Sequence, residues 1–176
     1  MREWIPVSTS PKGRLALAAV EQFGARTFDE VTVGELAAAA EVTTGALYHH
    51  FGSKLGLYAF VRDDVERRLL DRMEGAVAAA SDDSDRAAAV KAALLVGLDF
   101  AVREGFLRIL GDPPAGAEHD RLAEMLDART APASPVLGRV LAAAWRAALA
   151  AVAEGCEPDQ ARAALLAVEL QIPSGR

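Results

Sequence analysis

Residues 32–54, with the sequence TVGELAAAAEVTTGALYHHFGSK, constrain the fold more than any other stretch of the chain. Their pattern predicts two short helices joined by a tight turn. Thr32 can cap the first helix, and Glu35 completes a capping box in which each side chain satisfies a backbone N–H of the first turn. The small apolar face of this helix consists of Leu36, Ala37 and Ala40.

A second helix is predicted to begin after Thr43 and to run through about His50. Its inward positions are Ala46, Leu47 and Phe51. Its other face combines hydroxyl, phenol and imidazole groups with a glycine, from Thr44, Gly45, Tyr48 and His49. Two short helices joined in this way form a helix-turn-helix, whose second helix enters the major groove of DNA. The glycine lets a partner's backbone approach closely.

Periodicity alone leaves a second interpretation open, in which the two helices are ordinary bundle packing. The run YHHFGSK at 48–54 favours DNA binding over this alternative. A packed core does not need so many polar and aromatic groups together at the edge of a helix pair.

The stretch resembles the DNA-binding segment of the tetracycline-repressor (TetR) family of bacterial regulators. The most specific part of the resemblance is the pattern Gly45-x-Leu47-Tyr48-x-His50-Phe51-x-Ser53-Lys54-x-x-Leu57. Supporting matches are Phe23, Phe28, Val31-Thr32-Val33, Leu36-Ala37, Ala40 and Val42-Thr43. The resemblance implies a three-helix DNA-binding head, followed by a helical body that binds an effector and forms a dimer.

Two departures from the family pattern concern the turns of the head. The family commonly has glycine where Glu41 stands, in the turn, and where Thr27 stands, after the first helix. Both places tend to require a positive φ, which costs a residue with a Cβ about 1 kcal/mol. The angle of the second helix therefore depends on how these two residues are accommodated.

The resemblance assigns phosphate contacts to Tyr48, His50 and Lys54. Lys54 is also expected in the first turn of a long helix, where the dipole does not favour a cation, so its position suggests an outside anion. Thr32 and Thr43 lie at helix N-termini, where hydroxyl and backbone N–H groups can hold phosphate. The candidates for base contact are Thr44, Gly45 and His49.

The formal net charge of −6 argues against a broad basic surface of the kind DNA-binding domains usually show. The cations of the first sixty residues are Arg2, Lys12, Arg14, Arg26 and Lys54. They are offset by Glu3, Glu21, Asp29, Glu30, Glu35 and Glu41. DNA binding would therefore depend on the placement of a few cations, hydroxyls and helix N-termini. A modest salt dependence is expected, since its slope follows the number of phosphates neutralised.

The whole chain reads as all-α, with about nine helices. Ser10-Pro11 is a helix start, and Ser53 can cap a long helix that begins at Lys54. Gly105 and Gly155 are helix stops, and no strand-like alternation is present. We predict a helix-turn-helix DNA-binding domain over 1–53 and an effector-binding and dimerisation domain over 54–176.

The body offers an apolar cluster that could line an effector pocket between helices. Its members are Phe100, Phe106, Ile109, Leu110, Met125, Leu126 and Trp145. The alternative interpretation is plain core packing. Few charges are predicted to face inward, which suggests a largely apolar effector.

The last two helices show small residues and an apolar stripe that suit packing across a two-fold axis. The family resemblance implies dimerisation through the corresponding helix pair. The predicted interface residues are Leu141, Leu149, Val152, Leu165 and Val168.

Other kinds of function find little support in the sequence. No apolar run of about 18 residues predicts a membrane span, and the N-terminal residues lack the apolar core of a signal peptide, so a cytoplasmic location is expected. The three histidines have no spacing that suits a metal site, and no catalytic or phosphate-loop motif is present. We expect no enzyme activity, no metal and no cofactor. Cys156 is a lone cysteine without cationic neighbours, which is typical of an unreactive thiol.

Together these features predict a homodimeric TetR-type repressor that leaves a palindromic, double-stranded DNA operator when a small-molecule effector binds. One alternative is an activator, or a regulator without a small ligand. Another is an all-α binding protein or enzyme with no DNA role. The sequence does not identify the effector, the operator or the regulated genes.

Overall fold

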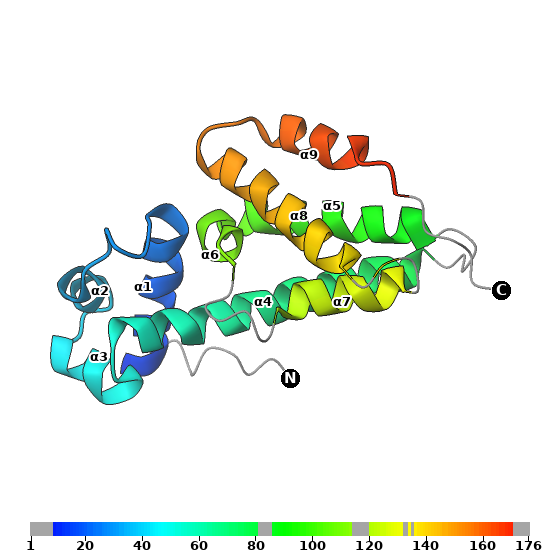
Figure 1. The fold of residues 1–176 in the computed structure, drawn as a ribbon. Coiled ribbons are helices and arrows are strands. Elements are labelled where there is room, and N and C mark those ends of the chain that lie inside the picture. Colours follow the sequence, from blue (N-terminus) through cyan, green and yellow to red (C-terminus); the bar gives the residue numbers. More distant parts are fainter. Residues whose placement is uncertain (1–8, 81–85, 114–119, 132–133, 135, 171–176) are drawn as a thin grey trace. The chain divides into compact units, whose positions relative to one another are not determined.

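The computed structural model describes residues 9–80, 86–113, 120–131, 134 and 136–170. All regular structure in these ranges is α-helical, which confirms the predicted fold class (Figure 1). The helices are α1 (Pro11–Ala25), α2 (Val33–Ala39), α3 (Thr44–Phe51), α4 (Lys54–Ala79), α5 (Arg86–Glu104), α6 (Leu107–Gly111), α7 (Arg121–Thr130), α8 (Leu137–Ala153) and α9 (Pro158–Ala167). No helix in the described ranges is long and apolar enough to cross a membrane.

The chain divides into two compact units, residues 1–66 and 67–176, which we call the head and the body. The division falls inside α4, so the first part of α4 belongs to the head. One reason is that the ring of Tyr58, on α4, packs against Phe23 of α1 with centroids 5.0 Å apart. The boundary predicted after residue 53 concerns where the DNA-binding segment ends, which is a different question from compactness, and it stays a prediction.

The predicted helix starts of the head are confirmed. The Ser10 hydroxyl accepts a hydrogen bond from the Gly13 N–H at 3.0 Å, and Pro11 occupies the first position of α1. Ser53 plays the same part for α4, since its Oγ accepts from the Gly56 N–H at 2.9 Å. Each cap satisfies a backbone donor that the helix itself leaves unpaired.

Helix α1 braces the helix-turn-helix by contacting both α2 and α3. The fully buried side chains of this small core include Leu15, Phe23, Leu36 and Leu47. Phe28, from the loop after α1, stacks on Phe23 and meets Tyr58 edge-on, at 5.8 and 5.2 Å between ring centroids. The apolar positions predicted from sequence therefore form the interior of the head.

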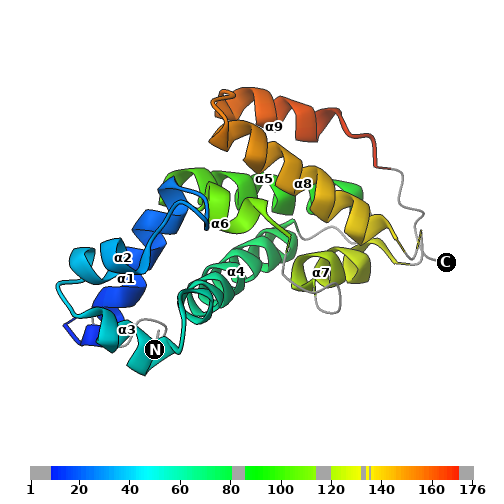
Figure 2. The same cartoon turned by 60° about the vertical axis from the view of Figure 1, so that its left-hand side comes forward.

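In the body, α8 contacts α5, α6, α7 and α9. Trp145 on α8 is fully buried, and its indole N–H donates to the Leu94 carbonyl of α5 at 3.0 Å. Helix α9 folds back along α8 after Gly155, whose φ of 105° ends α8 as predicted (Figures 1 and 2). The result is a helical hairpin with one side on the body core.

Gly56 marks a close approach that the sequence analysis did not single out. A Cβ built on this residue would lie 2.1 Å from the carbonyl oxygen of Phe51, at the end of α3. No side chain fits there unless one of the two helices moves. The contact therefore sets how near the end of α3 lies to the start of α4.

We expect Gly56→Ala to destabilise the protein by about 1–3 kcal/mol, as overpacking typically does. Gly75→Ala is the matched control, because it lies on the same helix and a Cβ added there would have no atom within 4 Å. The control should be neutral or stabilise by up to about 1 kcal/mol, since alanine favours helix. Urea unfolding of both variants measures the difference, and equal stabilities would contradict the tight contact.

Candidate nucleic-acid interface

Helix α3 presents the polar outward face that the sequence predicts. Thr43 caps the helix, with its Oγ accepting from the Ala46 N–H at 3.3 Å. Leu47 is fully buried and anchors the opposite side of the helix in the head. The exposed residues of the outward face are Thr44, Gly45, Tyr48 and His49. Tyr48 is 53% exposed, so its phenol is a surface group and not part of the core.

The first turn of α3 contains no acidic residue. Its free backbone N–H groups and the positive end of the helix dipole therefore remain available to an anion such as phosphate. At the other end of α3, the rings of His49 and His50 lie 5.0 Å apart between centroids. Within the described ranges, no group of three His, Cys, Asp or Glu side chains is placed to hold a metal ion.

The first turn of α2 differs, because its predicted capping box is present and brings in a carboxylate. Glu35 accepts hydrogen bonds from the Thr32 backbone N–H at 2.8 Å and from the Thr32 hydroxyl at 2.7 Å. The Thr32 hydroxyl, and after it the Arg26 guanidinium, lower the pKa of Glu35 to about 2. An ionised carboxylate thus stands where phosphate was expected, and this geometry argues against the phosphate contact predicted for Thr32.

The turn between α2 and α3 is a Schellman motif built on Glu41. The Glu41 N–H donates to the Ala38 carbonyl at 3.0 Å, and the Val42 N–H donates to the Ala37 carbonyl at 2.9 Å. Glu41 has a φ of 53°, the positive value expected from the glycine that the family places here. Thr27 has no positive φ, so the second departure from the family pattern is accommodated by a different local turn.

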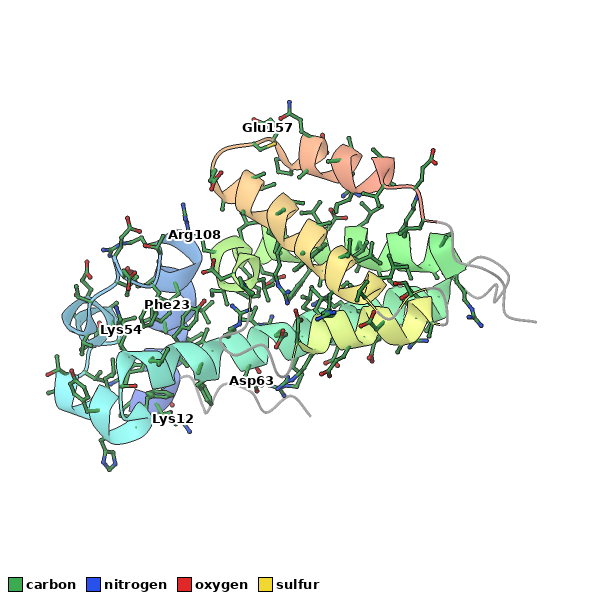
Figure 3. The ribbon with its side chains drawn as sticks, in the orientation of Figure 1. Lys12, Phe23, Lys54, Asp63, Arg108 and Glu157 are labelled. Atoms are coloured by element: carbon green, nitrogen blue, oxygen red, sulfur yellow. The ribbon has the colours of Figure 1, made fainter. Side chains whose placement is uncertain are left out.

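Lys54 lies in the first turn of α4, as predicted, but its ammonium points to the protein backbone. Figure 3 marks Lys54 in the head. Its Nζ donates to the carbonyl oxygens of Phe28 and Val31, both at 2.8 Å, and lies 4.1 Å from the centre of the Phe28 ring. The inference that this cation needs an anion from outside was wrong, because two carbonyl dipoles already stabilise its charge. The sequence carries no direct signal of this contact, since the partners are backbone atoms of a loop.

The other described cations among the first sixty residues also make internal contacts. Arg14 donates through Nε to the Ala40 carbonyl at 2.9 Å. Arg26 bonds Glu35 at 2.8 Å and also donates to the Glu30 carbonyl. The Lys12 ammonium lies over the Phe51 and Phe60 rings, at 5.8 and 5.1 Å from their centroids. Arg2 falls outside the described residues, so the described part of the head offers DNA mainly hydroxyls, helix dipole and imidazoles.

The seven residues predicted to line an effector pocket are all buried in the body, at 8% exposure or less. Phe100 and Phe106 meet edge-on with ring centroids 5.5 Å apart. The guanidinium carbon of Arg68 lies 5.7 and 5.5 Å from these two ring centroids, and that of Arg72 lies 4.7 Å from Phe100. An effector-binding role for this cluster stays a prediction.

The prediction that few charged side chains face the interior of the body is wrong for Arg146. This residue is only 8% exposed, next to Trp145 on α8. Its guanidinium bonds both carboxylate oxygens of Asp120, the N-cap of α7, at 2.6 and 2.8 Å. Burial raises the pKa of Asp120, but the bonds from Arg146 and from the Ala123 N–H more than offset this, so the pKa lies below its usual value. The sequence offered one indication of this burial: Arg146 directly follows Trp145, a residue of the predicted apolar stripe.

The predicted dimer-interface residues fall into two groups. Leu141, Leu149 and Leu165 are at most 6% exposed within a single chain. They pack inside the body and offer no surface to a partner, so their assignment to an interface is corrected. Val152 is half-buried and Val168 is 38% exposed. The error arose because the inward and outward stripes of α8 are both apolar.

Comparison with known proteins gives a family for the head. Residues 16–60 match the family model of bacterial regulatory proteins of the tetR family. A TetR-family transcriptional regulator from Pectobacterium atrosepticum has a similar structure over 87% of this chain and 87% of its own, with 24% identity and a TM-score of 0.60. A TetR-family regulator from Streptomyces coelicolor A3 aligns over 92% of this chain and 94% of its own, with 19% identity and a TM-score of 0.44. The predicted TetR resemblance is confirmed.

Glu41→Gly should stabilise the protein by about 1 kcal/mol, because glycine adopts positive φ without steric strain. Thr27→Gly is the matched control at the other family glycine position. It should destabilise by a similar amount, since Thr27 has no strain to relieve and its hydroxyl bond to Glu30 is lost. Thermal unfolding of both variants checks the signs, and a destabilised Glu41→Gly would show that the turn is not strained.

Gly45→Ala should raise stability slightly and weaken DNA binding. A Cβ added at this position would have Thr43 Oγ as its nearest atom, at 3.6 Å, so nothing inside the protein requires this glycine. Gly34→Ala is the control, because Gly34 is an exposed glycine of α2 with equally open space. Both variants should stabilise by up to about 1 kcal/mol. Only Gly45→Ala should lose affinity in a fluorescence-anisotropy titration, and full affinity would remove Gly45 from the interface.

Proposed function

We propose that the chain is a DNA-binding transcriptional regulator of the TetR family, whose family model its residues 16–60 match, and that it acts as a homodimeric repressor released from its operator by a small-molecule effector. The geometry of α3 carries this proposal. Leu47 is buried and fixes the helix in the head, the opposite face is polar and exposed, and the first turn contains no acidic residue. That arrangement suits a recognition helix in the major groove.

Within the head, we assign phosphate contacts to Thr43, Tyr48 and His50. Thr43 stands at the open N-terminus of α3, where an anion is favoured. The base-contact candidates remain Thr44, Gly45 and His49, which share the exposed face. Since regulators of this family act on bacterial genes, the proposed site of action is the cytoplasm.

A dimer is needed because one recognition helix reads only a few base pairs and the head has few cations to add affinity. The outward face of α8 supports self-association. It carries Val140, Ala143, Ala147 and Ala150, all exposed and spaced at helical intervals. Helix α9 adds Ala163, Leu166, Ala167 and Val168 on the exposed side of the same hairpin. An apolar face of this kind is typical of an interaction surface.

The effector would bind in the body against a mostly apolar wall, formed by the cluster around Phe100, Phe106 and Trp145. To release DNA, it must bind the DNA-incompetent conformation more tightly than the competent one. We propose that this conformation tilts α4 and changes the spacing of the two recognition helices in the dimer.

A regulator without a small ligand is the second candidate. It is favoured by the burial of all seven cluster residues, as in an ordinary core. Mobility-shift titration with fatty acids, aromatic acids and hydrophobic amines separates the two candidates. Release by one of these classes supports the effector, and an unchanged complex with every class supports the second candidate.

We predict a palindromic operator with half-site centres about 34–36 Å apart, one turn of DNA. Val140→Glu together with Ala147→Glu should abolish both dimerisation and operator binding, because the charges would be buried in the interface. Sedimentation and footprinting measure the two effects on the same samples.

The matched control is Val96→Glu together with Ala128→Glu, which places the same charges on exposed positions of α5 and α7. The control protein should remain a dimer and protect the operator. A wild-type monomer that protects an asymmetric site would overturn the dimer proposal. Substitution of Leu141 and Leu149 would not serve this test, because both are core residues.

A further inference from the structure

Helix α2 has seven residues, too few to be stable by itself in water. Its position, and that of α3 behind the turn, must therefore be set by tertiary contacts: the packing of Leu36 against α1 and the groups that hold its two ends. The described part of the head shows a cation at each end, one from α4 and one from α1.

At the N-terminal end, Lys54 reaches the loop that leads into α2. Its ammonium has three N–H donors, and two of them bond the carbonyls of Phe28 and Val31 at 2.8 Å. The Phe28 ring, 4.1 Å from Nζ, adds a cation–π contact. Val31 is fully buried and directly precedes the N-cap Thr32, so the ammonium is tied to the point where the chain enters α2.

At the C-terminal end, Arg14 reaches the carbonyls of the two residues that follow α2, the C-cap Ala40 and Glu41. Its Nε donates to the Ala40 carbonyl at 2.9 Å, and one Nη donates to the Glu41 carbonyl at 3.4 Å. The Ala40 carbonyl lies at the negative end of the helix dipole, where a cation is stabilising. The second oxygen is that of Glu41 itself, the strained residue of the turn, so Arg14 stabilises the conformation from which α3 begins.

We propose that Lys54 and Arg14 are positioning residues that clamp the two ends of α2 and thereby fix the recognition helix, and that they do not act as phosphate contacts. The inference rests on the proposed function for its DNA readout, but the clamp itself is a property of the free protein. It explains why a head with so few cations keeps two of them against its own backbone.

The test compares Lys54→Met and Arg14→Met with Lys91→Met, which removes the same charge from α5 in the body. Methionine keeps the long apolar stem and removes every donor. Hydrogen exchange of the free proteins measures protection in α2 and α3. Titrations at several salt concentrations, on a selected operator and on a random duplex, measure affinity and the slope of log K against log salt.

A clamp predicts faster exchange in α2 and α3 for both head variants, with α8 unchanged and Lys91→Met like wild type. Operator affinity should fall about tenfold or more, random-duplex affinity less, and the salt slope should stay within about 0.3 of wild type.

Two results would overturn the proposal. One is hydrogen exchange in α2 and α3 that is the same as in the wild type, together with a salt slope flatter by about 0.9 and equal losses of affinity for the operator and the random duplex. That combination identifies a phosphate contact. The other is that Lys54→Met and Arg14→Met show the same hydrogen exchange, DNA affinities and salt slope as Lys91→Met. If the wild-type protein binds no DNA, the proposed function fails, and the exchange data alone still decide the clamp.

Discussion

Helices α2 and α3, of seven and eight residues, are too short to persist in water without tertiary contacts. Everything the head does depends on this constraint. Leu36 and Leu47 hold the two helices against α1, and Gly56 lets the end of α3 lie directly on the start of α4. The backbone positions that a DNA groove would read are therefore set by packing and not by local propensity.

The same constraint governs the use of charge in the head. A protein with a net charge of −6 cannot rely on general attraction to DNA. Lys12, Arg14, Arg26 and Lys54 contact backbone carbonyls, a carboxylate or aromatic rings, where they stabilise the fold. Glu35 occupies the N-terminus of α2, whereas the N-terminus of α3 carries no acid. An anion is therefore favoured at the N-terminus of α3 over that of α2, and α3 is the helix whose outward face is exposed.

The body shows how one helix can have two apolar faces with different roles. The inward face of α8 carries Trp145 and Leu149, both fully buried. Its outward face carries Val140, which is 57% exposed. Between them lies Arg146, whose paired guanidinium ties α8 to the start of α7. A largely buried guanidinium is costly to leave without its carboxylate, so the pair favours one arrangement of the two helices.

The amino-acid sequence alone determined the helices, their caps and the resemblance of residues 16–60 to the TetR family. Those features depend on neighbouring residues: Thr32 and Glu35 form a box three positions apart, and Ser10, Ser53, Gly105 and Gly155 act within one turn of their helices. The outward face of α3 was also predictable, because it follows from helical periodicity around the buried Leu47.

Tertiary structure alone decided which partner each long polar side chain takes. Lys54 bonds carbonyls 23 and 26 residues away, and Arg146 pairs with Asp120, 26 residues away. It also decided which of two apolar stripes on α8 faces the core, since both stripes repeat at the helical period. These outcomes depend on distances between elements, which a local pattern of residues does not contain.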